Sequence, residues 1–372
     1  MNDTLGIVAM LVMMMTIIPL VGVIMAITPY LMKKSEWFTV TVPEIAQQDP
    51  FLRGLRKRYL ITMLLVTAVL TGLGIATAFV ESELAAIVLL SGGTLGIVVI
   101  GYGLMLRNRS RVRVYKREQN WVATRQEAVA VVLSEDSPQA LSLKWNLLYL
   151  PVIALILVIG LAGYSRMPEQ IILQVGLDGQ PTTIVDKSLP VTFMPALIQL
   201  FLALCLFFSH WMITRSKRLS SPSAPATSAL AYGMFARAQS MYLLALGMML
   251  SILMIMMPLS FMGVVTLMQA GIFIMVCTLV ALVGAIAIAV VYGQGGARVF
   301  ARMQASETIL ADEDRFWKLG IFFVNPEDPS LFLLERFGVG WTVNFARPAV
   351  WVILALLVVV TVAFVVAISL IA

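Results

Sequence analysis

Eight long apolar runs constrain this chain more than any other feature of its sequence. A helix needs about 20 mostly apolar residues to cross the hydrocarbon core of a bilayer, and each run is close to that length or longer. They fall near residues 5–31, 59–80, 84–106, 147–164, 190–212, 240–260, 263–292 and 349–371. Hydrophobic residues make up 60% of the 372 residues and charged residues only 12%, so water is a poor solvent for such a chain. We therefore predict an all-α polytopic membrane protein with about eight transmembrane helices.

The basic residues predict the orientation of these helices. If the runs cross the membrane alternately, all of the 26 Lys and Arg residues except Arg166 and Lys187 fall on one side. Cytoplasmic loops carry the excess of Lys and Arg in membrane proteins. The crowded side is therefore predicted to be cytoplasmic, in a multi-pass plasma-membrane protein with both termini extracellular. The net charge of +6 follows from this topology and does not predict nucleic-acid binding.

The order of spans and loops is similar in the two halves of the chain. Each half has a span, an inner loop, two spans with a short outer link, a long inner segment and a final span. This shared order of spans and loops suggests a 4+4 parallel repeat. The alternative is that two-span hairpins recur by chance. The predicted parts are a first four-helix half (1–164), an extracellular loop module (165–189), spans five to seven (190–292), a cytoplasmic domain (293–348) and the eighth span (349–372).

Three inner segments have distinct patterns. Residues 43–58 and 111–133 place apolar residues three and four apart with basic residues between them, which predicts amphipathic helices at the membrane surface. Residues 217–229 are polar and predict a flexible connector. Within 293–348, two β-prone stretches flank the turn signal of residues 325–329, which predicts a small hairpin-like element. Trp317 and Trp341 are expected to anchor this element at the level of the lipid headgroups.

The outer loop at 165–190 is the largest feature on the predicted extracellular side. Its alternating residues on both sides of Asp178-Gly179 predict a short β-hairpin with that dipeptide at the turn. It is our preferred contact site for an extracellular ligand, and a plain tether between two spans is the alternative. The candidate polar contacts are Gln170, Gln174, Asp178, Gln180 and Asp186.

Catalytic patterns are weak. The sequence contains no HExxH or CxxC motif and no Ser/His/Asp arrangement, so no catalytic residue, metal or cofactor is predicted. Cys205 and Cys277 lie in apolar runs and are interpreted as small buried hydrophobic residues. His210 is interpreted as a polar cap at the membrane surface in preference to a pH switch. The acidic run 312–314 is interpreted as a solvated turn or as ion-pair partners in preference to a cation site.

Two further polar groups have alternative interpretations. The run Gly293 to Gly296 with Arg298 could hold a phosphate through backbone N–H groups, but it lacks the strand and lysine of a P-loop, and a flexible exit from span seven is favoured. Gln199, Ser251 and Gln269 lie in the spans and are interpreted as interhelical hydrogen-bonding residues in preference to a substrate path.

Several motifs resemble a known family. Pro168-Glu169-Gln170-Ile171, Asp178 to Pro181 and Lys187-Ser188 resemble the extracellular module of the SdpI-like membrane proteins of Bacillota, and residues 38–59 are similar to the inner loop after their first span. The segment 293–345 is similar to their small C-terminal cytoplasmic domain. Its motif residues here are Gly295, Gly296, Arg298, Asp314, Arg315, Trp317, Asn325, Asp328, Arg336, Trp341 and Asn344. Relatives carry a His-aromatic-Asn pattern where this chain has Gln174, Val175 and Gly176.

The resemblance implies a non-enzymatic immunity or signalling protein in the plasma membrane of a Gram-positive bacterium. Such a protein would bind an extracytoplasmic peptide or envelope component through the outer loop. Its other expected partners are membrane lipids and a membrane or cytoplasmic protein, and nucleic acid is not expected. The alternative is a transporter or channel subunit, or an accessory subunit of a transporter. An intramembrane lipid-modifying enzyme has the least support, because no nucleophile and base can be paired.

Overall fold

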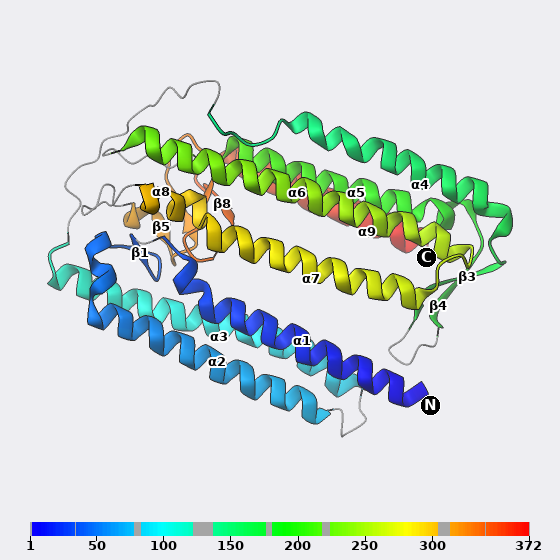
Figure 1. Ribbon diagram of the computed structural model, residues 1–372, viewed down its shortest axis with the longest axis horizontal. Coiled ribbons are helices and arrows are strands. Elements are labelled where there is room, and N and C mark those ends of the chain that lie inside the picture. The colour runs from blue at the N-terminus through cyan, green and yellow to red at the C-terminus, as the bar shows by residue number, and fades with distance from the viewer. Residues whose placement is uncertain are drawn as a thin grey trace.

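Long helices running side by side form most of the molecule (Figure 1). The structure is a computed structural model that describes residues 2–33, 35–77, 83–121, 137–175, 181–217, 224–303, 313–338 and 340–371. Its α-helices are α1 (Asn2–Leu31), α2 (Pro50–Thr77), α3 (Glu83–Glu118), α4 (Tyr149–Gly163), α5 (Leu189–Arg215), α6 (Pro225–Phe261), α7 (Leu267–Val291), α8 (Ala297–Met303) and α9 (Pro348–Ile371). Short 3₁₀ helices are η1 (Glu44–Gln48), η2 (Leu143–Leu148), η3 (Tyr164–Arg166), η4 (Gln294–Gly296) and η5 (Asp314–Phe316).

The prediction of an all-α polytopic membrane protein is confirmed. Seven helices are long and apolar enough to cross a membrane, namely α2 to α7 and α9, some of them together with a flanking helical turn. The predicted first span lies in α1, and the stretch Met15–Leu31 of this helix counts as a shorter apolar helix. Within a bilayer the backbone N–H and C=O groups must bond internally, and a helix satisfies this requirement over its whole apolar length.

Some helices extend beyond the predicted spans. The predicted interfacial helix at 43–58 is instead η1 followed by the start of α2, which runs without interruption into the membrane. In the same way α3 continues to Glu118 through the first part of 111–133, the rest of which lies largely outside the described residues, and α6 begins at Pro225 inside the predicted connector 217–229. Packing explains the extension of α2, because Leu52, Leu55 and Tyr59 are buried in a common core with α1 and α3.

The long helices pack as a group of three and a group of five, and the short α8 packs on α6 of the second group. Helices α1, α2 and α3 enclose one apolar core, which includes Ile18, Met63 and Ile97. Helix α4 packs on α5 and α6, α7 packs on α6, and α9 packs on α5. The predicted four-helix half 1–164 is therefore not one packed unit, because its last span belongs to the second group.

The two ends of the bundle differ in what they carry. Both termini lie at the same end as strands β3 (Gln170–Val175) and β4 (Pro181–Asp186), and we call this the hairpin end (Figure 1). At the opposite end, which we call the basic end, lie strands β1 (Glu36–Trp37) and β2 (Val40–Thr41), helix α8 and the C-terminal strands. The outer loop and the long inner segments are therefore at opposite ends, as the alternating topology predicts.

The predicted hairpin-like element at 316–345 is two small hairpins. Strands β5 (Trp317–Lys318) and β6 (Phe322–Phe323) pair antiparallel, as do β7 (Phe332–Leu334) and β8 (Trp341–Val343). A bridge between Phe323 and Asn344 joins them. The prediction that Trp317 anchors this element at the lipid headgroups is wrong, because Trp317 is buried against Phe323. Trp341 packs on Phe235 of α6. We call residues 313–347 the C-terminal element.

Polar and sulfur-containing residues of the spans differ in their contacts and in their exposure. The predicted interhelical bond is confirmed for Gln199 of α5, whose Nε2 donates to Ser251 Oγ of α6 at 2.7 Å. Gln269 instead forms a capping box with Thr266 at the start of α7. Cys277 is buried as predicted, whereas Cys205 is exposed on the surface of α5.

His210 is also a structural residue, although it does not lie at a surface. It is buried, with Nε2 2.9 Å from the carbonyl oxygen of Leu141 and Nδ1 2.9 Å from Asn146 Nδ2. A neutral imidazole that donates from Nε2 satisfies both bonds. His210 thereby holds the segment before α4 against α5.

Candidate functional site

The β3–β4 hairpin is amphipathic across its two faces. Ile171, Leu173 and Val185 pack on the ends of the second helix group, where they contact a core that includes Val191 and Phe261. Because side chains alternate along a strand, the neighbouring residues point to the opposite face. The hairpin is therefore fixed to the helices by one face and presents the other outward.

The outward face of the hairpin has an apolar centre between polar groups. Ile172 and Ile184 are directly opposite each other in the register and are 38% and 51% exposed. Gln170 pairs with Asp186 on one side of them. Beyond this pair a register shift interrupts the alternation, and there Thr183 Oγ1 donates to Gln174 Oε1 at 3.2 Å. We call this set the hairpin face.

The predicted ligand-contact residues are only partly described. Gln170, Gln174 and Asp186 are exposed on the hairpin face, whereas Asp178 and Gln180 lie outside the described residues. The sequence analysis did not select Ile172 and Ile184. Their alternation with the buried Ile171 and Val185 was the available signal, since a period of two places them on the outward face.

Lys187, one of the two basic residues on this side, closes the base of the hairpin. Its backbone N–H donates to the carbonyl of Glu169 at 2.7 Å, and its ammonium group lies 3.3 Å from Glu169 Oε1. The same ammonium group donates to the carbonyl of Met167 and lies 5.1 Å from the centre of the Tyr164 ring. This residue therefore stabilises the hairpin and is not available as a ligand contact.

At the basic end, Asp314 joins the C-terminal element to the first helix group. Its carboxylate accepts hydrogen bonds from the backbone N–H and hydroxyl of Thr41, from Lys116 Nζ at 2.9 Å and from Arg336 Nη1. Burial alone would raise the pKa of this carboxyl group, but the charges of Arg336 and Lys116 lower it to about 2. Asp314 is therefore a charged, buried ion-pair partner, so the predicted ion pairing is correct here and the solvated turn is wrong. Its partners are Arg336 and Lys116, in place of the neighbouring Arg315 and Lys318 that the sequence favoured.

Arg109 makes the second connection between the same parts. Its guanidinium donates to the carbonyl of Thr39 at 2.6 Å, to the Thr39 hydroxyl and to the carbonyl of Trp317 at 3.0 Å. The side chain is only 3% exposed. Together with Asp314, Arg336 and Lys116 it forms what we call the ionic junction.

A separate set of contacts holds the C-terminal element to α5 and shapes its turn. Lys217 lies 2.7 Å from Asp328 Oδ2 and 2.8 Å from Glu313 Oε1, and its charge helps to lower the pKa of Asp328 against the effect of burial. Asn344 accepts from the backbone N–H of Asn325 and donates to the carbonyls of Asn325 and Asp328. Arg315 is exposed, with its guanidinium over the ring of Phe316.

The glycines after α7 are required by close packing. Gly295 and Gly296 have φ values of +61° and +81°, a region that favours glycine. A Cβ atom on Gly296 would lie 2.2 Å from the carbonyl oxygen of Ala231. Arg298 donates to the carbonyls of Val290 and Tyr30, so it links α7 to α1. The predicted flexible exit is therefore a tightly fitted turn.

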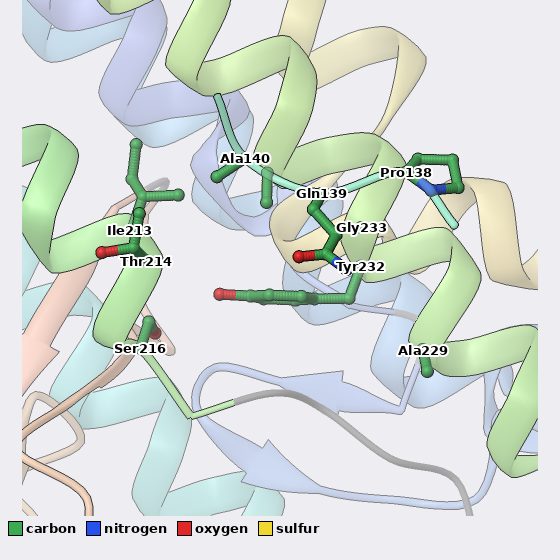
Figure 2. A pocket seen from close by; sticks show the side chains of 10 residues that line it. Pro138, Gln139, Ala140, Ile213, Thr214, Ser216, Ala229, Tyr232 and Gly233 are labelled. Atoms are coloured by element: carbon green, nitrogen blue, oxygen red, sulfur yellow. The ribbon is translucent and has the colours of Figure 1, made fainter. Parts of the chain in front are cut away.

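A small cavity lies near the basic end between α5, α6 and residues 138–140 (Figure 2). Its volume is about 90 Å³, and the ring of Tyr232 lies along it below Gln139 (Figure 2). Sites for small-molecule ligands are usually about 300–1,000 Å³, so this cavity has room for a few water molecules only. Among the described residues, no three His, Cys, Asp or Glu side chains gather where they could hold a metal ion.

The carboxyl group of Glu335 should make the free energy of unfolding depend on pH. Burial raises the pKa of its carboxyl group to about 7, above the value near 4.3 expected in an unfolded chain. The folded state therefore holds this proton more tightly, and stability is lost as pH rises from about 4.3 to 7. We expect Glu335→Gln to raise the melting temperature of the detergent-purified protein at pH 8 but not at pH 4.

The exposed Glu327 offers a control on the same element. Glu327→Gln should leave the melting temperature unchanged at both pH values. An equal effect of Glu335→Gln at pH 4 and pH 8 would contradict the assignment of a raised pKa.

Comparison with known proteins places a family match on part of the C-terminal element. A model described as a family of unknown function (DUF5808) matches residues 326–351, which include β7, β8 and the start of α9. No curated protein and no solved structure matches the chain. The matched segment contains Asp328, Arg336 and Asn344, so it includes residues that fix the C-terminal element to both helix groups.

Proposed function

We propose that this chain is a non-enzymatic membrane protein that binds an extracytoplasmic peptide or envelope component through the hairpin face. The observation that carries the proposal is the exposed pair Ile172 and Ile184, set between polar groups on a hairpin whose other face is fixed to the helices. Exposed apolar patches with a polar rim are typical of interaction sites. Each strand of a two-stranded sheet also pairs on one side only, so an extended peptide could add to its edge.

The proposal includes an orientation and a setting. The excess of Lys and Arg at the basic end supports a cytoplasmic position for that end and an extracellular position for the hairpin end. The resemblance of residues 168–188 and 293–345 to SdpI-like proteins of Bacillota supports an immunity or signalling role in the plasma membrane of a Gram-positive bacterium.

Survival of cells exposed to their own secreted peptides tests this function. The peptide fraction of spent medium is added to a strain that lacks the protein and to strains that express wild type or Ile172→Ser/Ile184→Ser. We expect wild type to restore survival and the double variant to survive no better than the strain without the protein. Both substitutions are on the surface, so the amount of inserted protein should stay the same.

Val264 provides the matched control, because it is exposed in the link between α6 and α7, at the end where α6 finishes. Val264→Ser should protect as well as wild type. Full protection by the double variant would refute the role of the hairpin face. Solute flux in proteoliposomes that contain only this chain would favour the transporter hypothesis instead.

A further inference from the structure

A cavity at the basic end lies between the two helix groups. One side is formed by the end of α1, by Gln47 of η1 and by Arg56 of α2. The other side is formed by η4 and α8. Its volume is about 370 Å³, within the usual range for small-ligand sites. It is therefore large enough for a polar headgroup.

The cavity is lined by four basic side chains. They come from both helix groups and are Lys33, Arg56, Arg298 and Arg302. No carboxylate is present among its described lining residues. Lys33 has a distant ion-pair partner in Glu36, at 3.6 Å. A concentration of positive charge that Glu36 neutralises only in part favours an anion.

Arg56 is held in a fixed position by aromatic rings. Its guanidinium lies 3.6 Å from the centre of the Trp37 ring and 5.1 Å from that of Tyr30. Its Nε atom is buried and has no hydrogen-bond acceptor among the described residues. A stacked guanidinium keeps the N–H groups at its edge available, and these match the oxygens of a phosphate.

Gln294 adds a second unsatisfied group to the cavity lining. It is 2% exposed, and its Nε2 donates to the carbonyl of Gly340 at 2.7 Å. Its Oε1 is buried and has no donor among the described residues. Buried polar atoms without partners are uncommon in folded proteins, and a bound polar molecule is one of their explanations. A hydroxyl group next to the phosphate would satisfy this oxygen.

The position of the cavity relative to the spans identifies the source of the phosphate. Helix α1 ends at Leu31 and α7 at Val291, and the cavity is lined by residues 30–33 and by residues from 293 onward. It therefore lies where two apolar helices finish, at the level of the lipid headgroups. Basic pockets between helices on this side of a membrane are suited to anionic headgroups.

We propose that this cavity binds the phosphate of an anionic phospholipid, with Arg56 and Arg302 as the principal cations and Gln294 as the acceptor for a headgroup hydroxyl. This site is independent of the hairpin face, so either proposal can fail without the other.

The test compares two lipids of the same chain length on the full-length protein. Delipidated protein is incubated with dioleoylphosphatidylglycerol or dioleoylphosphatidylcholine, and the retained lipid is counted by native mass spectrometry. We expect phosphatidylglycerol to be retained in preference. Charge-assisted hydrogen bonds of this kind lead us to expect that Arg56→Gln/Arg302→Gln weakens its binding by about tenfold or more.

The control variant removes two cations of the same end that do not line the cavity. Lys57 and Arg117 are exposed, and Lys57→Gln/Arg117→Gln should weaken binding by less than about twofold, because exposed charges are screened. The single variant Arg302→Gln tests whether misfolding explains the loss. The Arg302 side chain is exposed, so this variant should fold normally and still weaken phosphatidylglycerol binding. Equal retention of the two lipids, or equal losses in the two double variants, would overturn the proposal. Inorganic phosphate could instead stabilise the protein, with no further gain in stability when phosphatidylglycerol is added. That result would also overturn the proposal, in favour of a soluble phosphate as the ligand.

Discussion

Asp314→Asn should destabilise the protein by roughly 3–5 kcal/mol, which is the usual cost of removing one partner from a buried ion pair. The amide keeps the shape of the carboxylate but removes the charge that Arg336 and Lys116 share. The C-terminal element would then be held to α3 and to residues 36–41 by Arg109 and by the contacts of Arg336 with Thr39 and Glu36. Thermal unfolding of the detergent-purified protein at pH 7 should show a lower melting temperature.

The pH dependence of this effect provides a further check. The pKa of Asp314 is lowered to about 2, so its contribution is complete above the unfolded value near 3.9 and is lost as pH falls towards 2. Wild type and Asp314→Asn should therefore differ fully at pH 7 and less at pH 3. A difference of the same size at both pH values, or no difference at pH 7, would argue against the ionic junction as described.

Gly296→Ala is expected to have the second largest effect, more than about 2 kcal/mol. A positive φ costs an alanine about 1–3 kcal/mol, and overpacking adds about 1–3 kcal/mol. Both apply here, because Gly296 has a φ of +81° and its Cβ would meet the backbone carbonyl of Ala231. Backbone cannot move aside as a side chain can. The melting temperature should fall, and α8 should become more accessible to protease.

Gly54→Ala is the matched control, and it should change stability in the opposite direction. Gly54 lies inside α2, and a Cβ there has no neighbour within 4 Å. Alanine in a helix interior is favoured over glycine by about 0.5–1 kcal/mol. A similar loss of stability in both variants would indicate that the tight turn after α7 is not responsible.

The spans could be predicted from the sequence because the bilayer imposes a length and an apolar composition on each of them. Their ends could not be predicted equally well. Helix α2 begins at Pro50 because Leu52 and Leu55 are buried by tertiary contacts and Arg56 lies over the ring of Trp37. A scan for apolar runs stops at the first basic residues and does not register such packing.

The ionic junction shows why only half of a site could be predicted. Asp314 and Arg336 belong to a motif that could be selected by resemblance, whereas their partners could not. Thr41 and Asp314 are 273 positions apart, and no local spacing connects them. Arg109 was counted as one of many cytoplasmic cations, although it is nearly inaccessible in the folded chain. Burial of a single cation in a basic segment has no sequence signal.

The ionic junction also affects the order of assembly during synthesis. Arg109 and Thr39 are made before α5, α6 and α7, whereas Asp314, Trp317 and Arg336 are made after these helices. Until then the guanidinium of Arg109 has no access to its acceptor on Trp317. A nascent or truncated chain would therefore display uncompensated charge beneath its first three helices, a feature by which membrane proteases and chaperones could distinguish incomplete molecules from finished ones.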